Sequence, residues 1–158
     1  MNSRILITTF LLLTLLTGTV IAAPVISADN KYLDISTGLY VLNGNVRIET
    51  GSRVITAGQA KANMLSMEVW GTGGVTVTQD DISFSGNQVY VNGPQSQAQI
   101  EGNIVYSRTG LQVTAESAEY NWRNRTAMFS GNVQVTENGA TWTADRINYN
   151  LETNSFYN

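Results

Sequence analysis

The chain has 158 residues, of which 42% are hydrophobic and 13% are charged, and its formal net charge at pH 7 is −3. This length and composition predict a single domain with a sizeable core and exclude a disordered chain. Basic residues form no cluster, so we expect no nucleic-acid partner. The chain contains neither cysteine nor histidine, which excludes disulfide bonds and a lipidated cysteine anchor and removes the commonest catalytic bases, thiol nucleophiles and metal ligands. We therefore expect a protein that is not an enzyme and that has no cofactor and no metal site.

The N-terminal residues have the pattern of a signal peptide. Arg4 precedes an apolar run over residues 5–21, and small residues close that run. The run of 17 residues is short for a membrane-spanning helix, which needs about 20 apolar residues. We expect cleavage after Ala22, so that residues 1–22 are a signal peptide and residues 23–158 form the mature domain. An uncleaved membrane anchor is the alternative.

The beginning of the mature domain matches part of a unit that recurs later. Residues 26–29 (Ile-Ser-Ala-Asp) align with residues 113–116 (Val-Thr-Ala-Glu) at a displacement of 87 residues, and residues 40–42 align with residues 127–129 at the same displacement. The domain is therefore predicted to start inside a partial unit.

From residue 44 onward the chain repeats four times with a period of 29 residues. Glycines open the four units, and an asparagine stands 19 residues after each of them: Gly44, Gly73, Gly102 and Gly131, followed by Asn63, Asn92, Asn121 and Asn150. A repeat of this length indicates one supersecondary unit that buries its apolar face against its neighbours.

Each unit has the alternation that is typical of strands with one buried face. Apolar residues stand at the third and fifth positions of every unit, and a turn follows, with Asn138-Gly139 in the last unit as a strong hairpin signal. The alternation then resumes in a second run, a third short run and a last apolar pair. No helical period occurs after residue 22, so we expect an all-β domain. The inward apolar row is Val46, Ile48, Ile55, Val75, Val77, Phe84, Ile104, Tyr106, Val113, Val133, Val135 and Trp142.

This inward row has two interpretations, a packed core or an apolar groove. Small residues recur at one neighbouring inward position: Ala57, Gly86, Ala115 and Ala144. A row of small side chains beside a row of large ones leaves space along the axis, which favours the groove.

The other conspicuous residues are interpreted as structural. We expect the repeated asparagines to make turns, the unit glycines to make bulges or corners, and Asp80-Asp81 to be hairpin residues rather than a catalytic pair. The next glycine of the series would fall at position 160, so residues 154–157 are predicted to form an end strand with one unpaired edge.

The repeated motifs resemble a known family. The recurring Gly-Asn-Val, the following apolar-Thr-Ala-Asp/Glu and the closing Tyr-Asn, as in residues 113–121 and 142–150, are similar to the OstA-like repeats of lipopolysaccharide-transport proteins, a family that includes LptA and the N-terminal domain of LptD. The resemblance covers about residues 25–158. It implies a single antiparallel sheet rolled into an open β-jelly roll, a β-taco, whose interior binds the acyl chains of lipid A. The inward row named above would then be the lipid-binding site.

The resemblance also implies a place and partners for the protein. It would lie in the periplasm, carry lipopolysaccharide from the inner to the outer membrane, and associate head to tail with its own copies and with homologous β-jelly-roll domains of the membrane components. Two alternatives stay open. An LptC-like, membrane-anchored role follows if residues 5–21 are retained, and a parallel β-helix would make the chain a structural or adhesin module.

Overall fold

The computed structural model describes residues 23–157, so the predicted signal peptide lies outside the described residues. This part of the chain consists of strands and turns, which confirms the all-β prediction. The strands are β1 (Val25–Ser27), β2 (Asn30–Asp34), β3 (Leu39–Thr50), β4 (Arg53–Asn63), β5 (Glu68–Gln79), β6 (Ile82–Asn92), β7 (Gln97–Arg108), β8 (Leu111–Asn121), β9 (Thr126–Glu137), β10 (Ala140–Asn150) and β11 (Ser155–Tyr157).

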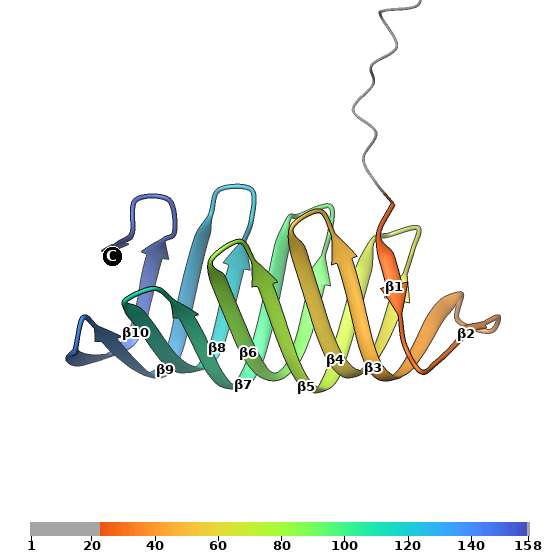
Figure 1. Ribbon diagram of the computed structural model, residues 1–158, viewed down its shortest axis with the longest axis horizontal. Helices are drawn as coiled ribbons and strands as arrows, with labels where there is room; N and C mark the ends of the chain where they lie inside the picture. Colours follow the sequence, from red (N-terminus) through yellow and green to blue (C-terminus); the bar gives the residue numbers. More distant parts are fainter. Residues whose placement is uncertain (1–22, 158) are drawn as a thin grey trace, which may run out of the picture.

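All eleven strands belong to one sheet (Figure 1). From β3 to β11 each strand pairs with the next one in the sequence, and both β1 and β2 pair with β3. Every pairing is antiparallel. This arrangement excludes the parallel β-helix and agrees with the open β-jelly roll that the resemblance implied.

Each long strand bends sharply at its middle. Between β3 and β4 the register shifts at Gly44 and Asn45, whose φ angles are 73° and 47°. Two successive residues in the left-handed region favour glycine and asparagine, which explains the repeated Gly-Asn pair. The prediction that these glycines form bulges is confirmed. The sequence predicted the second and third runs of each unit as separate short strands. They are the two halves of one bent strand, as in β4 (Arg53–Asn63), so this detail of the prediction is wrong.

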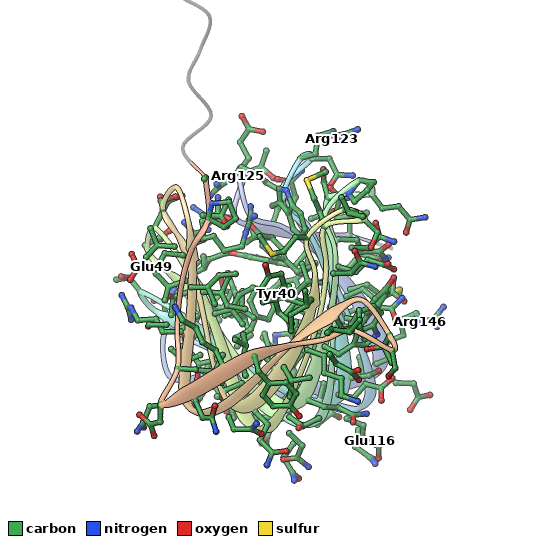
Figure 2. The ribbon with its side chains drawn as sticks, turned by 90° about the vertical axis from the view of Figure 1, so that its right-hand side faces the viewer. Tyr40, Glu49, Glu116, Arg123, Arg125 and Arg146 are labelled. Atoms are coloured by element: carbon green, nitrogen blue, oxygen red, sulfur yellow. The ribbon has the colours of Figure 1, made fainter. Side chains whose placement is uncertain are left out.

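The bends fold the sheet into a V with two arms. The first arm ends in a row of turns, here called the first rim, at residues 51–52, 80–81, 109–110 and 138–139. The second arm ends in the second rim, at residues 35–38, 64–67, 93–96, 122–125 and 151–154. Viewed along the axis, Glu116 lies at the closed corner and Arg125 at the open top, while Tyr40 lies between the arms (Figure 2). The inner face is therefore shielded on two sides and reached through the gap between the rims.

The repeated asparagines build the turns of the second rim, as predicted. The Oδ1 atom of Asn121 accepts hydrogen bonds from the backbone N–H groups of Arg123 and Asn124, at 3.0 and 3.2 Å. Asn63, Asn92 and Asn150 accept equivalent bonds in their own turns. In the partial first unit Asp34 stands at the same position and accepts a bond of 2.9 Å from the N–H of Ser36.

The acidic residue of the repeated Thr-Ala-Asp/Glu motif supports the corner. The side chain of Asn45 donates a hydrogen bond of 2.8 Å to Asp29, and Asn132 donates one to Glu116 in the same way. The Thr-Ala-Asp/Glu motif and the Gly-Asn pair therefore act together. The acidic side chain of the first motif accepts a hydrogen bond from the asparagine of the second and so holds it in its left-handed conformation.

Both ends of the sheet follow the predicted repeat. Ile26 of β1 pairs with Ile48, just as Val113 pairs with Val135 at a displacement of 87 residues. At the other end β11 adds to β10, with Phe156 opposite Tyr149. β1 and β2 are thus one bent strand that is interrupted at its corner, and β11 is the beginning of another.

Candidate functional site

The predicted inward row lies on the inner face of the V. Eleven of its twelve side chains are buried, with at most 5% of their surface exposed: Val46, Ile48, Ile55, Val75, Val77, Phe84, Ile104, Tyr106, Val113, Val133 and Val135. Trp142 is 37% exposed, because β11 covers only the second arm and leaves this part of β10 at the edge of the sheet. Its ring meets Phe156 edge-on, with 5.2 Å between the ring centroids.

Toward the C-terminal end the interior is filled by aromatic rings. An aromatic cluster is formed by five residues: Phe84, Tyr106, Tyr120, Phe129 and Tyr149. The centroid of the Phe84 ring lies 4.7 Å from that of Tyr106 and 5.1 Å from that of Tyr120. Such offset ring pairs contribute beyond the apolar area that they bury. Side chains therefore pack this half of the V, as in a closed core.

The small inward residues do not leave the space that the sequence suggested. A Cβ atom at Gly86 would lie 2.6 Å from Ile100 Cγ2 and 3.0 Å from Ile104 Cδ1. Ala57 and Ala115 are buried as well. At Gly86 the predicted space is therefore absent, because the side chains of Ile100 and Ile104 occupy it.

Toward the N-terminal end the interior opens into a cavity of about 350 Å³. Ile26, Ile48 and Ile55 of the first arm line one side of it. Met64, Met67 and Val69 of the second arm line the other side. The volume falls within the range of ordinary ligand pockets, about 300–1,000 Å³, and the walls are mainly apolar. Of the predicted inward row, this cavity exposes Ile48 and Ile55 to a ligand.

A wall of two side chains separates the cavity from the aromatic cluster. The guanidinium of Arg53, the first residue after the first-rim turn at 51–52, lies 3.9 Å from the centroid of the Trp122 ring on the second rim. Arg53 also donates hydrogen bonds of 3.2 and 3.1 Å to Gln79, which accepts a further bond of 3.2 Å from the Tyr120 hydroxyl. Burial lowers the pKa of Arg53, and nearby Tyr120 and Asp80 oppose that shift. The contact is a cation–π interaction that joins the rims.

A second contact, here called the clasp, joins the rims above the aromatic cluster. Arg108, the last residue before the first-rim turn at 109–110, forms an ion pair of 2.7 Å with Asp81 and donates a hydrogen bond of 2.8 Å to the carbonyl oxygen of Leu151 on the second rim. The same guanidinium donates to Asn154. Asp81 thus does more than shape its turn, because it holds Arg108 in position for the opposite rim.

Asp80 makes the third connection. Its Oδ2 atom lies 3.4 Å from Nη1 of Arg125.

The sequence did not identify Arg53, Arg108 and Arg125 as residues that join the two rims. The available signal was the placement of arginines and aspartates at strand ends in a chain with few charges, but no spacing rule indicates which turns face each other across the V.

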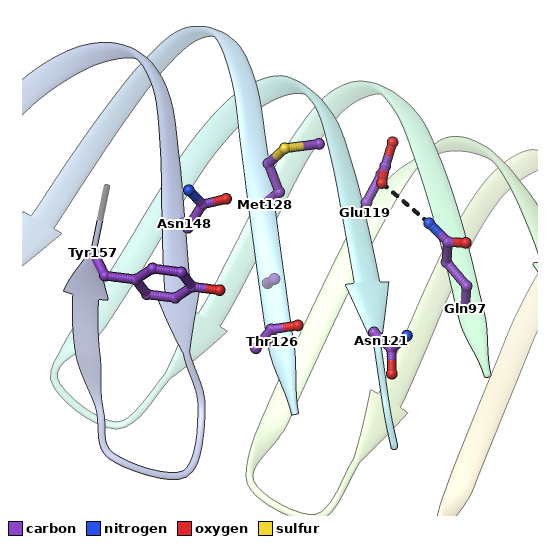
Figure 3. A pocket seen from close by; sticks show the side chains of 8 residues that line it. Gln97, Glu119, Asn121, Thr126, Met128, Asn148 and Tyr157 are labelled. Carbon is purple, nitrogen blue, oxygen red and sulfur yellow. Dashed lines mark hydrogen bonds between the residues drawn. The ribbon is translucent and has the colours of Figure 1, made fainter. Parts of the chain in front are cut away.

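The outer surface of the second arm has a different character from the interior. Gln97 donates a hydrogen bond of 3.0 Å to Glu119 there, beside a shallow polar depression that Asn148 and Tyr157 also line (Figure 3). The sheet thus has a polar outer face and an apolar inner face, so apolar ligands would bind to the inner face. Within residues 23–157, no helix is long and apolar enough to cross a bilayer.

Comparison with known proteins agrees with this architecture. Residues 55–155 match the family described as "LptA/(LptD N-terminal domain) LPS transport protein". The chain belongs to this LptA/LptD family. Its members are transport proteins, and the OstA-like resemblance drawn from the repeats is thereby confirmed.

One solved structure with the same fold as this LptA/LptD family member is LptH from Pseudomonas aeruginosa, described as the LptA-homologous periplasmic component of the conserved lipopolysaccharide transport device. The TM-score is 0.58 at 18% sequence identity, and the alignment covers 63% of this chain and 76% of LptH. At this identity the likeness concerns the fold, an open β-jelly roll. No curated protein matches the chain.

Proposed function

We propose that this LptA/LptD family member is a periplasmic protein that binds lipopolysaccharide through its acyl chains and carries it from the inner toward the outer membrane. The observation that carries the proposal is the V-shaped sheet with an inner row of aliphatic and aromatic side chains and a cavity of about 350 Å³ that opens beside Ile48 and Ile55. Burial of an acyl chain contributes about 0.8 kcal/mol per methylene group, so several chains supply ample affinity without any catalytic group.

The acyl chains enter at the cavity and extend along the inner row. The cavity accepts the first part of a chain as it stands, whereas the aromatic cluster beyond it must give way to a longer one. The three rim contacts of Arg53, Arg108 and Arg125 hold that half closed in the absence of lipid. Ile48 and Ile55 make the first contacts, and the rest of the inward row becomes available as the rims separate.

Substitutions in the cavity test this proposal without disturbing the core. Met64 and Met67 line the cavity but are 43% and 60% exposed, so charges are tolerated there. Val77, by contrast, is 1% exposed, and a charge at that position would unfold the sheet rather than report on binding. We expect Met64→Glu combined with Met67→Glu to weaken binding of a fluorescent lipopolysaccharide at least tenfold.

Leu65 provides the matched control. It lies in the same turn and is 97% exposed, but it does not line the cavity. Leu65→Glu adds one negative charge at nearly the same place, where the double variant adds two, so it measures the repulsion per charge between the protein and the anionic lipid. Equal loss in Leu65→Glu and in the double variant would contradict binding in the cavity.

We further propose that the end strands pair with like domains, head to tail. Within the described residues, β1 and β2 form one edge of the sheet, while β11 and the first half of β10 form the other. Unpaired edges of this kind accept an additional strand from another chain. The partners would be further copies of this protein and the homologous domains of the membrane components.

Proline substitutions test the edge pairing, because proline removes a backbone donor. In the antiparallel pairing of β10 with β11 the N–H groups of Ser155 and Tyr157 face β10, so Phe156 carries the donor that points to the free edge. We expect Phe156→Pro to abolish concentration-dependent self-association in analytical ultracentrifugation. Phe156→Ala keeps the donor and controls for loss of the ring. Unchanged association in the proline variant would exclude this edge as an interface.

The periplasmic location and the LptC-like alternative differ in whether the peptide bond after Ala22 is cleaved. Determination of the N-terminal residue of the mature protein distinguishes them, because a start at Ala23 means that the predicted signal peptide is removed. Retention of residues 5–21 would instead favour a membrane-anchored role in the same pathway.

A further inference from the structure

Tyr106 has a buried hydroxyl group with no hydrogen-bond partner among residues 23–157. The whole residue is 0% exposed. The other two tyrosines of the aromatic cluster are satisfied: the hydroxyl of Tyr120 donates to Gln79 at 3.2 Å, and that of Tyr149 donates to Asn154 at 3.1 Å. Of the three tyrosines in the aromatic cluster, Tyr106 is the one whose hydroxyl has no partner among the described residues.

Packing does not explain this hydroxyl. The ring of Tyr106 contacts Phe84 and Phe129, with centroid separations of 4.7 and 5.4 Å, and a phenylalanine would make the same ring contacts. A buried polar group without a partner costs about 1–3 kcal/mol, and native proteins retain few of them. An uncompensated hydroxyl in an apolar interior indicates a partner that arrives from outside the chain.

The hydroxyl lies next to the clasp. Tyr106 and Arg108 are two residues apart on β7, so their side chains leave the same face of the strand, with Arg108 nearer the rim. Burial raises the pKa of Tyr106, Tyr149 adds to that effect, and the positive charge of Arg108 opposes it. Since Arg108 stands two residues nearer the rim on the same face, the phenol lies beneath the clasp, and separation of the rims would open a path to it.

We propose that the Tyr106 hydroxyl is a polar subsite of the groove, which hydrogen-bonds an oxygen atom carried on a bound acyl chain. The inference rests on the proposed function, since it requires that acyl chains occupy the interior. The side chains packed around the ring are aromatic or aliphatic, and the charged groups of the clasp lie nearer the rim, so the site fits a ligand that is apolar except for one oxygen atom rather than a free sugar. A phenol both donates and accepts, so a chain hydroxyl or an ester carbonyl satisfies it equally well.

The subsite makes the groove selective. A site with a buried hydrogen-bonding group rejects a ligand that lacks the matching group, because its own group then stays unpaired. A chain that bears a hydroxyl near its head should therefore bind better than the same chain without it. We expect a preference of at least fivefold for 3-hydroxytetradecanoic acid over tetradecanoic acid, measured as competition against a fluorescent fatty acid bound to the full mature protein.

Tyr106→Phe removes only the hydroxyl. We expect this variant to bind both fatty acids and to lose the preference between them. Tyr120→Phe is the matched control, since it removes a hydroxyl that already has a partner in the same cluster, and it should keep the preference. Thermal melting gives an independent readout: Tyr106→Phe should melt no lower than the wild type, whereas Tyr120→Phe should melt lower because it leaves Gln79 without that donor.

The outcomes distinguish failure of the subsite from failure of the proposed lipid binding. A preference that persists in Tyr106→Phe, or a wild type that binds both acids with equal affinity, overturns the subsite while the proposed lipid binding stands. A wild type that binds neither fatty acid nor lipopolysaccharide overturns the proposed function, and the subsite with it. Lower melting of Tyr106→Phe than of Tyr120→Phe also contradicts the subsite, because it would mean that the hydroxyl has a structural partner.

Discussion

Arg108 donates a hydrogen bond of 2.8 Å to the carbonyl oxygen of Leu151, across the gap between the two rims. The two residues are 43 positions apart in the sequence and belong to different arms of the V. Arg108 is one of three arginines, with Arg53 and Arg125, that join the arms above the inner face. Its contact therefore contributes to the stability of the closed half and restricts the separation of the arms there.

Replacement of Arg108 should loosen that half. The Arg108 side chain is 14% exposed, and Arg108→Ala leaves a carbonyl and Asp81 without their partner. Hydrogen bonds to charged groups contribute about 1.5–3 kcal/mol, so we expect a loss of about 2 kcal/mol in the free energy of unfolding, measured by urea denaturation.

The Arg47–Glu49 pair offers the comparison for this variant. Both side chains are well exposed, at 50% and 40%, and the pair lies within one strand. Arg47→Ala should change stability by less than about 0.5 kcal/mol. Similar losses in Arg47→Ala and Arg108→Ala would mean that the rim contact is no stronger than an ordinary surface ion pair.

The asparagines of the second rim should be replaceable by aspartate but not by alanine. Asn121→Ala removes the acceptor of two backbone hydrogen bonds, and we expect a loss of about 1 kcal/mol in thermal or urea unfolding. Asn121→Asp keeps an oxygen at the same place, as Asp34 does in the first unit. Equal stability of the alanine variant and the wild type would contradict the turn-forming role.

The bend should not tolerate a side chain at Gly86. A methyl group there would lie 2.6 Å from Ile100 Cγ2, and overpacking of this kind costs about 1–3 kcal/mol. Ile100→Ala removes the opposing atom, so the double variant should be more stable than the sum of the two single losses predicts. Additive losses in this double-mutant cycle would show that the two positions do not compete for space.

Acid should weaken the outer face of the second arm near Glu68. Hydrogen bonds from Ser66 and Tyr90 lower the pKa of Glu68. A depressed folded-state pKa means that these bonds stabilise the fold fully above the ordinary value, near 4.3, and that this contribution is lost as the pH falls through the folded-state value.

The test for Glu68 is a carboxyl NMR titration. Ser66→Ala should move the pKa of Glu68 upward, toward its ordinary value, and should make the melting temperature less sensitive to acid. Ser83→Ala removes a hydroxyl on another strand and should leave the titration of Glu68 unchanged. A Glu68 titration that is the same in Ser66→Ala and the wild type would contradict the assigned cause.

The repeat predicted the sheet well because it fixes register. A displacement of 87 residues carries the pair Val113 and Val135 onto Ile26 and Ile48, which are indeed paired, since equivalent residues of a repeat make equivalent pairs. The same period identified the turns at Asn63 and Asn121. Alternation likewise indicated which side chains point inward, and burial agrees at all those positions except Trp142, where the sheet edge decides the exposure.

The interior itself could not be predicted from the same signals. Alternation says that Phe84 and Tyr106 share a face, but not that their rings fill it while Ile48 and Ile55 border a cavity. That difference depends on the volume of each side chain and on the angle between the arms. The contact of Arg53 with Trp122 depends on the twist of the sheet, which sets which turns face each other and leaves no trace in the spacing.

The two ends of the sheet are not complementary in outline. At the N-terminal end β1 and β2 both rest on β3, so both arms finish at the same level. At the C-terminal end β11 extends the second arm, whereas the first arm finishes one strand earlier, beside Trp142. A flush face that meets this stepped face leaves a slot one strand wide, about 4.8 Å, in the first arm. A strand that fills the slot would cover Trp142, the most exposed aromatic ring of the inner row.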